Sequence, residues 1–224
     1  MKALQRNNSL IGDNRFTSAG GFSLVELIFS LMLSLLILGV AVATFSGALG
    51  SRDRESSRTD ALTSAQAALN VMSREIGNSG YGLIDNGIVL ADSNANQLHF
   101  RANIQNTGSD GYDTAQPGED ITFYCETCNG ITSGSVVRRD ANVNGGAPSG
   151  IINRVSDVDF AYFDVNPTTG VVTGPLTVPS VNTIRVDITL KVVLPNLQGQ
   201  PVNRIETVAS DVTLRNSIYM REQY

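Results

Sequence analysis

The chain has 224 residues, with 21 acidic side chains against 16 basic ones, a single histidine and no tryptophan. Its net charge of −5 does not favour nucleic-acid binding, which requires a basic patch. No Ser/His/Asp set, phosphate-binding loop or paired-carboxylate motif is recognisable, so we expect no enzymatic activity.

A short basic leader precedes an uncharged apolar run. Residues 1–21 are mostly polar and carry three basic side chains against one acidic one, whereas no charged residue occurs from Leu27 to Ser51. These 25 residues, at about 1.5 Å each, suffice for a helix to cross a ~30 Å hydrocarbon layer. The basic leader predicts that residues 1–21 stay in the cytoplasm and that the chain beyond the run lies outside it.

Glu26 is the anomaly at the start of this run. It lies in the octapeptide Gly20-Gly21-Phe22-Ser23-Leu24-Val25-Glu26-Leu27. A carboxylate at the mouth of a membrane-length segment is unfavourable, so an ionisable group in this position indicates a function. A positive charge close to Glu26 would offset the unfavourable free energy of placing this carboxylate in an apolar environment.

The octapeptide and the apolar run resemble the class III signal of type IV pilins and of type II secretion pseudopilins. The resemblance implies that a prepilin peptidase cuts between Gly21 and Phe22, removes residues 1–21 and methylates the new amino group of Phe22. It also implies that this ammonium pairs with Glu26 of a neighbouring subunit in a bundle of pilin helices. At ~4 Å and an effective dielectric near ~20, such a pair contributes on the order of 4 kcal/mol before desolvation.

Two other interpretations of the N-terminal segment stay open. An ordinary secretory signal would be cut at a small-residue site such as Ser46-Gly47-Ala48 or Ala48-Leu49-Gly50. That signal would be unusually long and would begin with a carboxylate. An uncleaved anchor would keep the leader.

The helix is expected to continue past the membrane. We expect a transmembrane and assembly helix over residues 22–50 and an amphipathic continuation over residues 51–80. Apolar residues recur there at steps of three and four, which places them on one helix face: Leu62, Ala65, Leu69, Met72 and Ile76. This stripe predicts packing on the chain that follows, and a coiled coil with a partner is the alternative.

Residues 81–224 predict a β-rich head. Short apolar runs alternate with Asn, Gly, Asp and Ser, which is typical of strands and turns. The expected strands are Ile88–Leu90, Leu98–Asn103, Ile121–Cys125, Gly134–Arg139, Asp157–Tyr162, Val171–Val178, Ile184–Val192 and Val208–Leu214, with polar loops over residues 106–118 and 140–150. Strands that alternate apolar and polar residues favour an antiparallel sheet with one buried face, so the fold class is α+β.

The segment in which the long helix is expected to end points to a smaller group within the pilin family. The segment from Leu69 to Gly82, LNVMSREIGNSGYG, is similar to the helix exit of PilW-like minor pilins, and J-type pseudopilins have a related layout. The resemblance implies a type IV pilin-like fold, in which a long N-terminal helix packs on an antiparallel sheet.

The same resemblance implies a function and a location. A minor pilin of this kind spans the inner membrane once with its head in the periplasm, and then joins the pilus at the cell surface. Its partners are the prepilin peptidase and other major and minor pilins, and it primes or joins pilus assembly for adhesion, twitching motility or DNA uptake. A J-type minor pseudopilin of a type II secretion system is the alternative.

The two cysteines, Cys125 and Cys128, form a Cys-x-x-Cys motif. In an exported chain this motif favours a structural disulfide. A redox pair would place Cys125 at a helix N-terminus, and a metal site would need more ligands than His99, the single histidine, which lies in an expected strand. A membrane-anchored periplasmic redox or binding domain therefore remains a third interpretation.

A weak calcium motif begins at Asp140. Oxygen-bearing side chains at Asp140, Asn142 and Asn144 precede Gly145, as in the first half of a calcium loop. The twelfth position is Ile151, where a bidentate glutamate is required. The sequence therefore favours an ordinary polar loop without a cofactor, with calcium as the alternative.

Overall fold

The computed structural model describes residues 21–105, 112–128, 134–197, 201–217 and 220. The expected leader lies outside these residues apart from Gly21, as does part of the expected loop over residues 106–118. The chain divides into two compact units, Met1–Ala48 and Leu49–Tyr224.

A single helix, α1, extends from Leu24 to Ile76. Within the first unit, every described side chain from residue 21 to residue 48 is exposed. Within the second unit, α1 buries one face through Ala65, Ala68, Leu69, Met72 and Ile76. The expected stripe is confirmed at all its positions except Leu62, which is half-buried, and it also includes Ala68.

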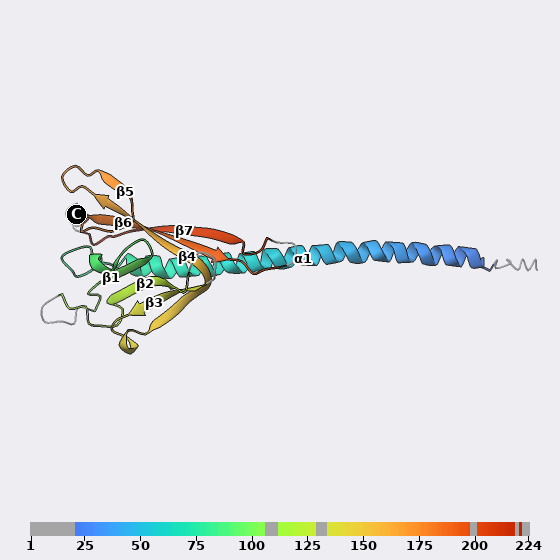
Figure 1. Ribbon diagram of the computed structural model, residues 1–224, viewed down its shortest axis with the longest axis horizontal. Coiled ribbons are helices and arrows are strands. Elements are labelled where there is room, and N and C mark those ends of the chain that lie inside the picture. Colours follow the sequence, from blue (N-terminus) through green and yellow to red (C-terminus); the bar gives the residue numbers. More distant parts are fainter. Residues whose placement is uncertain (1–20, 106–111, 129–133, 198–200, 218–219, 221–224) are drawn as a thin grey trace, which may run out of the picture. The chain divides into compact units, whose positions relative to one another are not determined.

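The second unit contains one antiparallel sheet in the order β1-β2-β3-β4-β6-β7, with β5 paired to β4 outside this path (Figure 1). The strands are β1 (Gln97–Arg101), β2 (Asp120–Glu126), β3 (Gly134–Asp140), β4 (Pro148–Val165), β5 (Val172–Leu176), β6 (Thr183–Val193) and β7 (Ile205–Thr213). Figure 1 shows the second half of α1 lying along this sheet. The expected α+β layout is therefore confirmed.

Alternation along the central strands produces the core. In β4, Val158, Phe160 and Tyr162 are buried, whereas Asp157 and Asp159 are only half-buried. A strand points successive side chains to opposite faces, so one face of the sheet is apolar and covered by α1. The opposite face carries the polar side chains of the same strands.

Two glycines fix the exit of α1 against β1. Gly80 and Gly87 have φ values of 76° and 75°, which strain any other residue. A Cβ atom on Gly87 would collide with the backbone nitrogen of Gly80 and the backbone oxygen of Arg101. The same backbone groups form hydrogen bonds, because Gly80 donates to the Arg101 carbonyl at 2.9 Å and Arg101 donates to the Gly87 carbonyl at 2.7 Å.

The expected strand Ile88–Leu90 was wrong. Ile88 forms only an isolated bridge to Phe100, and Leu90–Asp92 is a 3-10 turn, η1. The Ser93 hydroxyl donates to the His99 carbonyl at 3.1 Å and accepts from the His99 amide at 3.0 Å. The His99 carbonyl still accepts from the Val89 amide at 2.9 Å, but the His99 amide, which a continued ladder would use, is taken by Ser93, so pairing ends there.

Candidate functional site

The N-terminal segment contains the motif that the sequence singles out. Gly21, Phe22 and Ser23 precede the first turn of α1, in which the Leu27 amide donates to the Ser23 carbonyl at 3.1 Å. Phe22 is 82 % exposed. The cleavage bond expected between Gly21 and Phe22 therefore lies in non-helical backbone with exposed side chains around it.

Glu26 lies in the first turn of α1. The free amide groups at a helix N-terminus make this end partly positive, which favours a carboxylate there. The effect offsets part of the unfavourable transfer of Glu26 into an apolar environment.

The first half of α1 exposes large apolar side chains on all sides. From Leu24 to Leu49, residues of this kind are between 44 % and 75 % exposed. A helix that is apolar all round is a membrane span or is covered by other molecules. α1 is long and apolar enough to cross a membrane, a criterion that an N-terminal signal sequence also meets. The segment is thus a candidate membrane anchor or signal sequence.

Cys125 and Cys128 form a disulfide at the end of β2. Both side chains pack against the core. Cys125 belongs to a strand and not to a helix N-terminus, which is the position that lowers the pKa of a redox-active thiol. The disulfide thus links the end of β2 to the residues that directly follow it.

Two of the three calcium candidates, Asp140 and Asn142, take part in local hydrogen bonds, and Asn144 begins the 3-10 turn Asn144–Gly146. The buried carboxylate of Asp140 accepts from the Gly118 amide at 2.7 Å and from the Asn142 amide at 3.1 Å. The side-chain amide of Asn142 donates hydrogen bonds to the carbonyls of Thr114 and Gln116. Across the part of the chain that the structure describes, no group of three or more His, Cys, Asp or Glu side chains could hold a metal ion.

His99 joins two carboxylates at the edge of the sheet. Its Nδ1 lies 3.1 Å from Asp92 Oδ2, and its Nε2 lies 2.7 Å from Asp120 Oδ1. The Arg101 guanidinium donates to the other oxygen of Asp120 at 2.8 Å. His99 lies in β1, so its expected position in a strand is confirmed. Its hydrogen bonds connect η1 to β1 and β2.

The outward face of the sheet contains a second polar network. Lys191 Nζ donates to Asp159 at 2.6 Å and to Asp157 at 2.9 Å. These hydrogen bonds, the one to Asp159 first, raise the pKa of Lys191 above its usual value. On the covered face, burial raises the pKa of Tyr162, whose hydroxyl donates to the Asn94 carbonyl at 2.8 Å.

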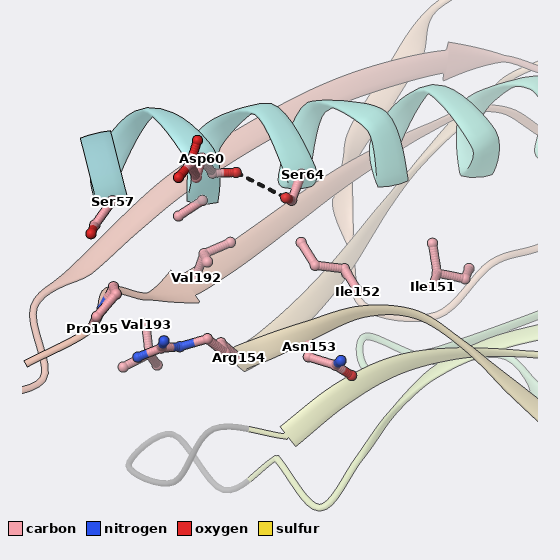
Figure 2. A pocket seen from close by; sticks show the side chains of 11 residues that line it. Ser57, Asp60, Ser64, Ile151, Ile152, Asn153, Arg154, Val192, Val193 and Pro195 are labelled. Carbon is pink, nitrogen blue, oxygen red and sulfur yellow. Dashed lines mark hydrogen bonds between the residues drawn. The ribbon is translucent and has the colours of Figure 1, made fainter. Parts of the chain in front are cut away.

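The sequence did not predict a groove between α1 and the strands, which Figure 2 shows. Its lining residues are Ser57, Asp60, Ala61, Ser64, Ile151, Ile152, Asn153, Arg154, Val192, Val193 and Pro195. Arg154 has a φ of 64°, unusual for a residue with a side chain. The sequence pattern gives no sign of this, because Arg154 lies in an otherwise ordinary strand.

Comparisons with family models, with curated proteins and with solved structures found no match to this chain.

Proposed function

We propose that this chain is a PilW-like minor type IV pilin, a structural subunit that primes or joins pilus assembly. One combination of features carries the proposal. The Gly21-Phe22 junction and Glu26 lie directly before a helix segment that exposes apolar side chains on all sides. The α+β layout of the second unit is compatible with a pilin head.

The proposed sequence of events begins at the inner membrane. The basic leader stays in the cytoplasm, the apolar part of α1 spans the bilayer, and the head folds in the periplasm. A prepilin peptidase cuts the bond between Gly21 and Phe22 and methylates the nitrogen of Phe22. The subunit then leaves the bilayer by packing its helix against other pilin helices.

The chemistry of Glu26 gives this packing its specificity. Cleavage creates an ammonium on Phe22, four residues before the carboxylate. A neighbouring subunit can place that ammonium beside Glu26, and each charge offsets the desolvation of the other. A helix that lacks either group would leave one charge unpaired in an apolar environment.

Processing tests the proposal directly. The full chain is expressed with a prepilin peptidase as wild type, as Gly21→Val and as the matched control Gly20→Val. We expect a faster-migrating form for wild type and Gly20→Val, and only the precursor for Gly21→Val. We also expect the processed form in the sheared surface-filament fraction. A processed form from all three chains, or from cells without the peptidase, contradicts the proposal.

A J-type pseudopilin would share the N-terminal chemistry, so processing alone does not separate the two systems. Deletion of the gene, scored for surface pili and for release of secreted proteins, separates them. The minor pilin predicts loss of pili with secretion unchanged. Loss of secretion with pili unchanged assigns the chain to type II secretion.

A further inference from the structure

The groove in the second unit has an apolar floor and two charged walls. It encloses about 500 Å³. Ile152, Val192 and Val193 are buried at its floor. Figure 2 shows Asp60 on the α1 side and Arg154 on the strand side, with Ile152 and Val192 between them.

Arg154 is placed at the groove by irregular strand pairing. Gly134 pairs with Val155 while Ser135 pairs with Asn153, so Arg154 has no opposite residue on β3. Such a bulge re-aims a side chain, and the left-handed backbone conformation of Arg154 is unfavourable for a residue other than glycine. The fold keeps this arginine at the rim although its backbone conformation is unfavourable.

Neither charge at the rim is neutralised within the described residues. The other strand arginines all have partners, since Arg101, Arg138 and Arg185 form ion pairs and Arg139 donates to a backbone carbonyl. No ion pair within the described part of the chain involves Arg154 or Asp60. Among the described residues, the groove therefore presents one positive and one negative charge without an ion-pair partner across an apolar floor.

One exposed face of α1 has the complementary pattern. Leu49, Arg52, Asp53 and Ser56 follow the spacing i, i+3, i+4 and i+7, which places them on the same face. All four are exposed, and Leu49 is 44 % exposed. The described residues provide no ion-pair partner for Arg52 or Asp53.

We propose that the groove binds residues 49–56 of α1 from a second copy of this chain. Asp53 of the second copy faces Arg154, Arg52 faces Asp60, and Leu49 covers the apolar floor. The groove and residues 49–56 share no residue, although Ser56 and Asp60 are neighbours on one side of α1, so the contact joins two unlike sets of residues and is head-to-tail. This inference rests on the proposed function, for which it supplies a specific contact between subunits.

Cysteine cross-linking tests the contact on the full chain in membranes. The chain carrying Ser56→Cys and Asn153→Cys is oxidised and compared with the chain carrying Ser51→Cys and Asn153→Cys. Ser51 is also an exposed serine, but it lies on the opposite face of α1. The native cysteines are already joined to each other.

We expect a ladder of dimers and higher oligomers with Ser56→Cys, at least about five times stronger than with Ser51→Cys. Equal cross-linking from both serines overturns the proposal, as does cross-linking of Ser56→Cys only to a different protein. A mass measurement of the head verifies that the Cys125–Cys128 disulfide has not exchanged with the introduced cysteines, and the near-ultraviolet circular dichroism of the tyrosines verifies that each variant has folded.

Charge reversal adds a second measurement. In the Ser56→Cys background, Arg154→Glu should lower cross-linking by about five- to tenfold, because two negative charges then face each other at a partly exposed rim. Asp53→Arg added to Arg154→Glu should restore it, whereas Arg52→Glu added to Arg154→Glu should not. Failure of this selective rescue contradicts the pairing.

The outcomes separate this inference from the proposed function. Membranes are tested whether or not the leader has been removed, so absence of the ladder counts against the groove in either case. Normal processing and filament assembly without a Ser56→Cys ladder leave the proposed function standing. A ladder without processing supports the groove and contradicts the proposed function.

Discussion

The two parts of α1 have the same backbone conformation and opposite surfaces. From Leu24 to Ala48, the helix carries one charged residue and exposes every side chain. From Ala65 to Ile76, it buries a single stripe against the sheet and keeps charges such as Arg74 on the outside. The second part finds its apolar partner within the chain, whereas the first part is exposed along its whole length, as a candidate membrane anchor or signal sequence is.

Replacing Glu26 should produce the largest effect in this comparison. Glu26→Gln removes the charge from the first part of α1 while keeping the shape of the side chain. In the proposed helix bundle, this leaves the ammonium of a neighbouring Phe22 unpaired. Removing one partner of a buried ion pair costs about 3–5 kcal/mol, so assembly into filaments should fall by at least about a hundredfold. Quantitative blots of sheared filaments measure it.

Glu26→Asp is the matched control, because it keeps the charge with a shorter side chain. It should retain part of the assembly, and processing of both variants should equal that of wild type. Normal assembly of Glu26→Gln contradicts the pairing.

Truncating one leucine in each part gives the next largest difference. Leu69 is fully buried, whereas Leu36 is 67 % exposed. Leu69→Ala should lower the free energy of unfolding of the head by about 2–5 kcal/mol, because it leaves a cavity under the sheet. Leu36→Ala should leave that free energy unchanged.

Denaturant titrations of the full chain in detergent, followed by the near-ultraviolet circular dichroism of the tyrosines, measure both leucine variants. Equal effects would mean that the two parts do not differ in environment as described.

Paired glycine substitutions sharpen the contrast further. Gly87→Ala should destabilise the head by about 1–3 kcal/mol, because alanine is strained at a φ of 75° and meets neighbouring backbone. Gly47, in the first part of α1, has no neighbouring atom within 4 Å of an added Cβ. Gly47→Ala should therefore leave the unfolding of the head unchanged in the same titration. A stable Gly87→Ala head would contradict the close contact at the helix exit.

The smallest effect is a pH dependence on the outward face of the sheet. Because hydrogen bonds to Asp159 and Asp157 raise the pKa of Lys191, their contribution is present below its usual pKa of about 10.4. It is lost as the pH rises through the raised value. The side chain is 37 % exposed, so the contribution is below about 1 kcal/mol.

Unfolding titrations between pH 7 and pH 12 compare wild type with Lys191→Met. The wild-type advantage should disappear only at the alkaline end. An advantage that persists there, or that is lost in acid alone, contradicts this origin.

The spacing of apolar residues predicted much of the fold, because the side chains that a helix or a strand buries recur at the period of that element. The buried stripe of α1 and the alternating burial along β6 were predictable because each element packs against a single layer, so its apolar residues recur with the period of the helix or strand. The prediction of a strand at Ile88–Leu90 was wrong because the Ser93 hydroxyl binds the His99 amide, a local side-chain effect that the apolar pattern does not reveal. The start of β4 at Pro148 lies within an expected polar loop, because Pro148, Ser149 and Gly150 carry no apolar alternation although they pair with β3.

The candidate sites divide in the same way. Glu26 stands out in the sequence because it interrupts an apolar run. Arg154 does not, because its φ and its groove depend on how three strands are aligned. A local anomaly can be found in a sequence, whereas a site made by a register shift becomes visible only in the fold.

The mass of the mature protein from surface filaments tests the account most directly. We predict residues 22–224 with a methyl group on the nitrogen of Phe22. A chain that still begins at Met1 in cells with an active prepilin peptidase, or one that begins at Leu49 or Ser51, would contradict it.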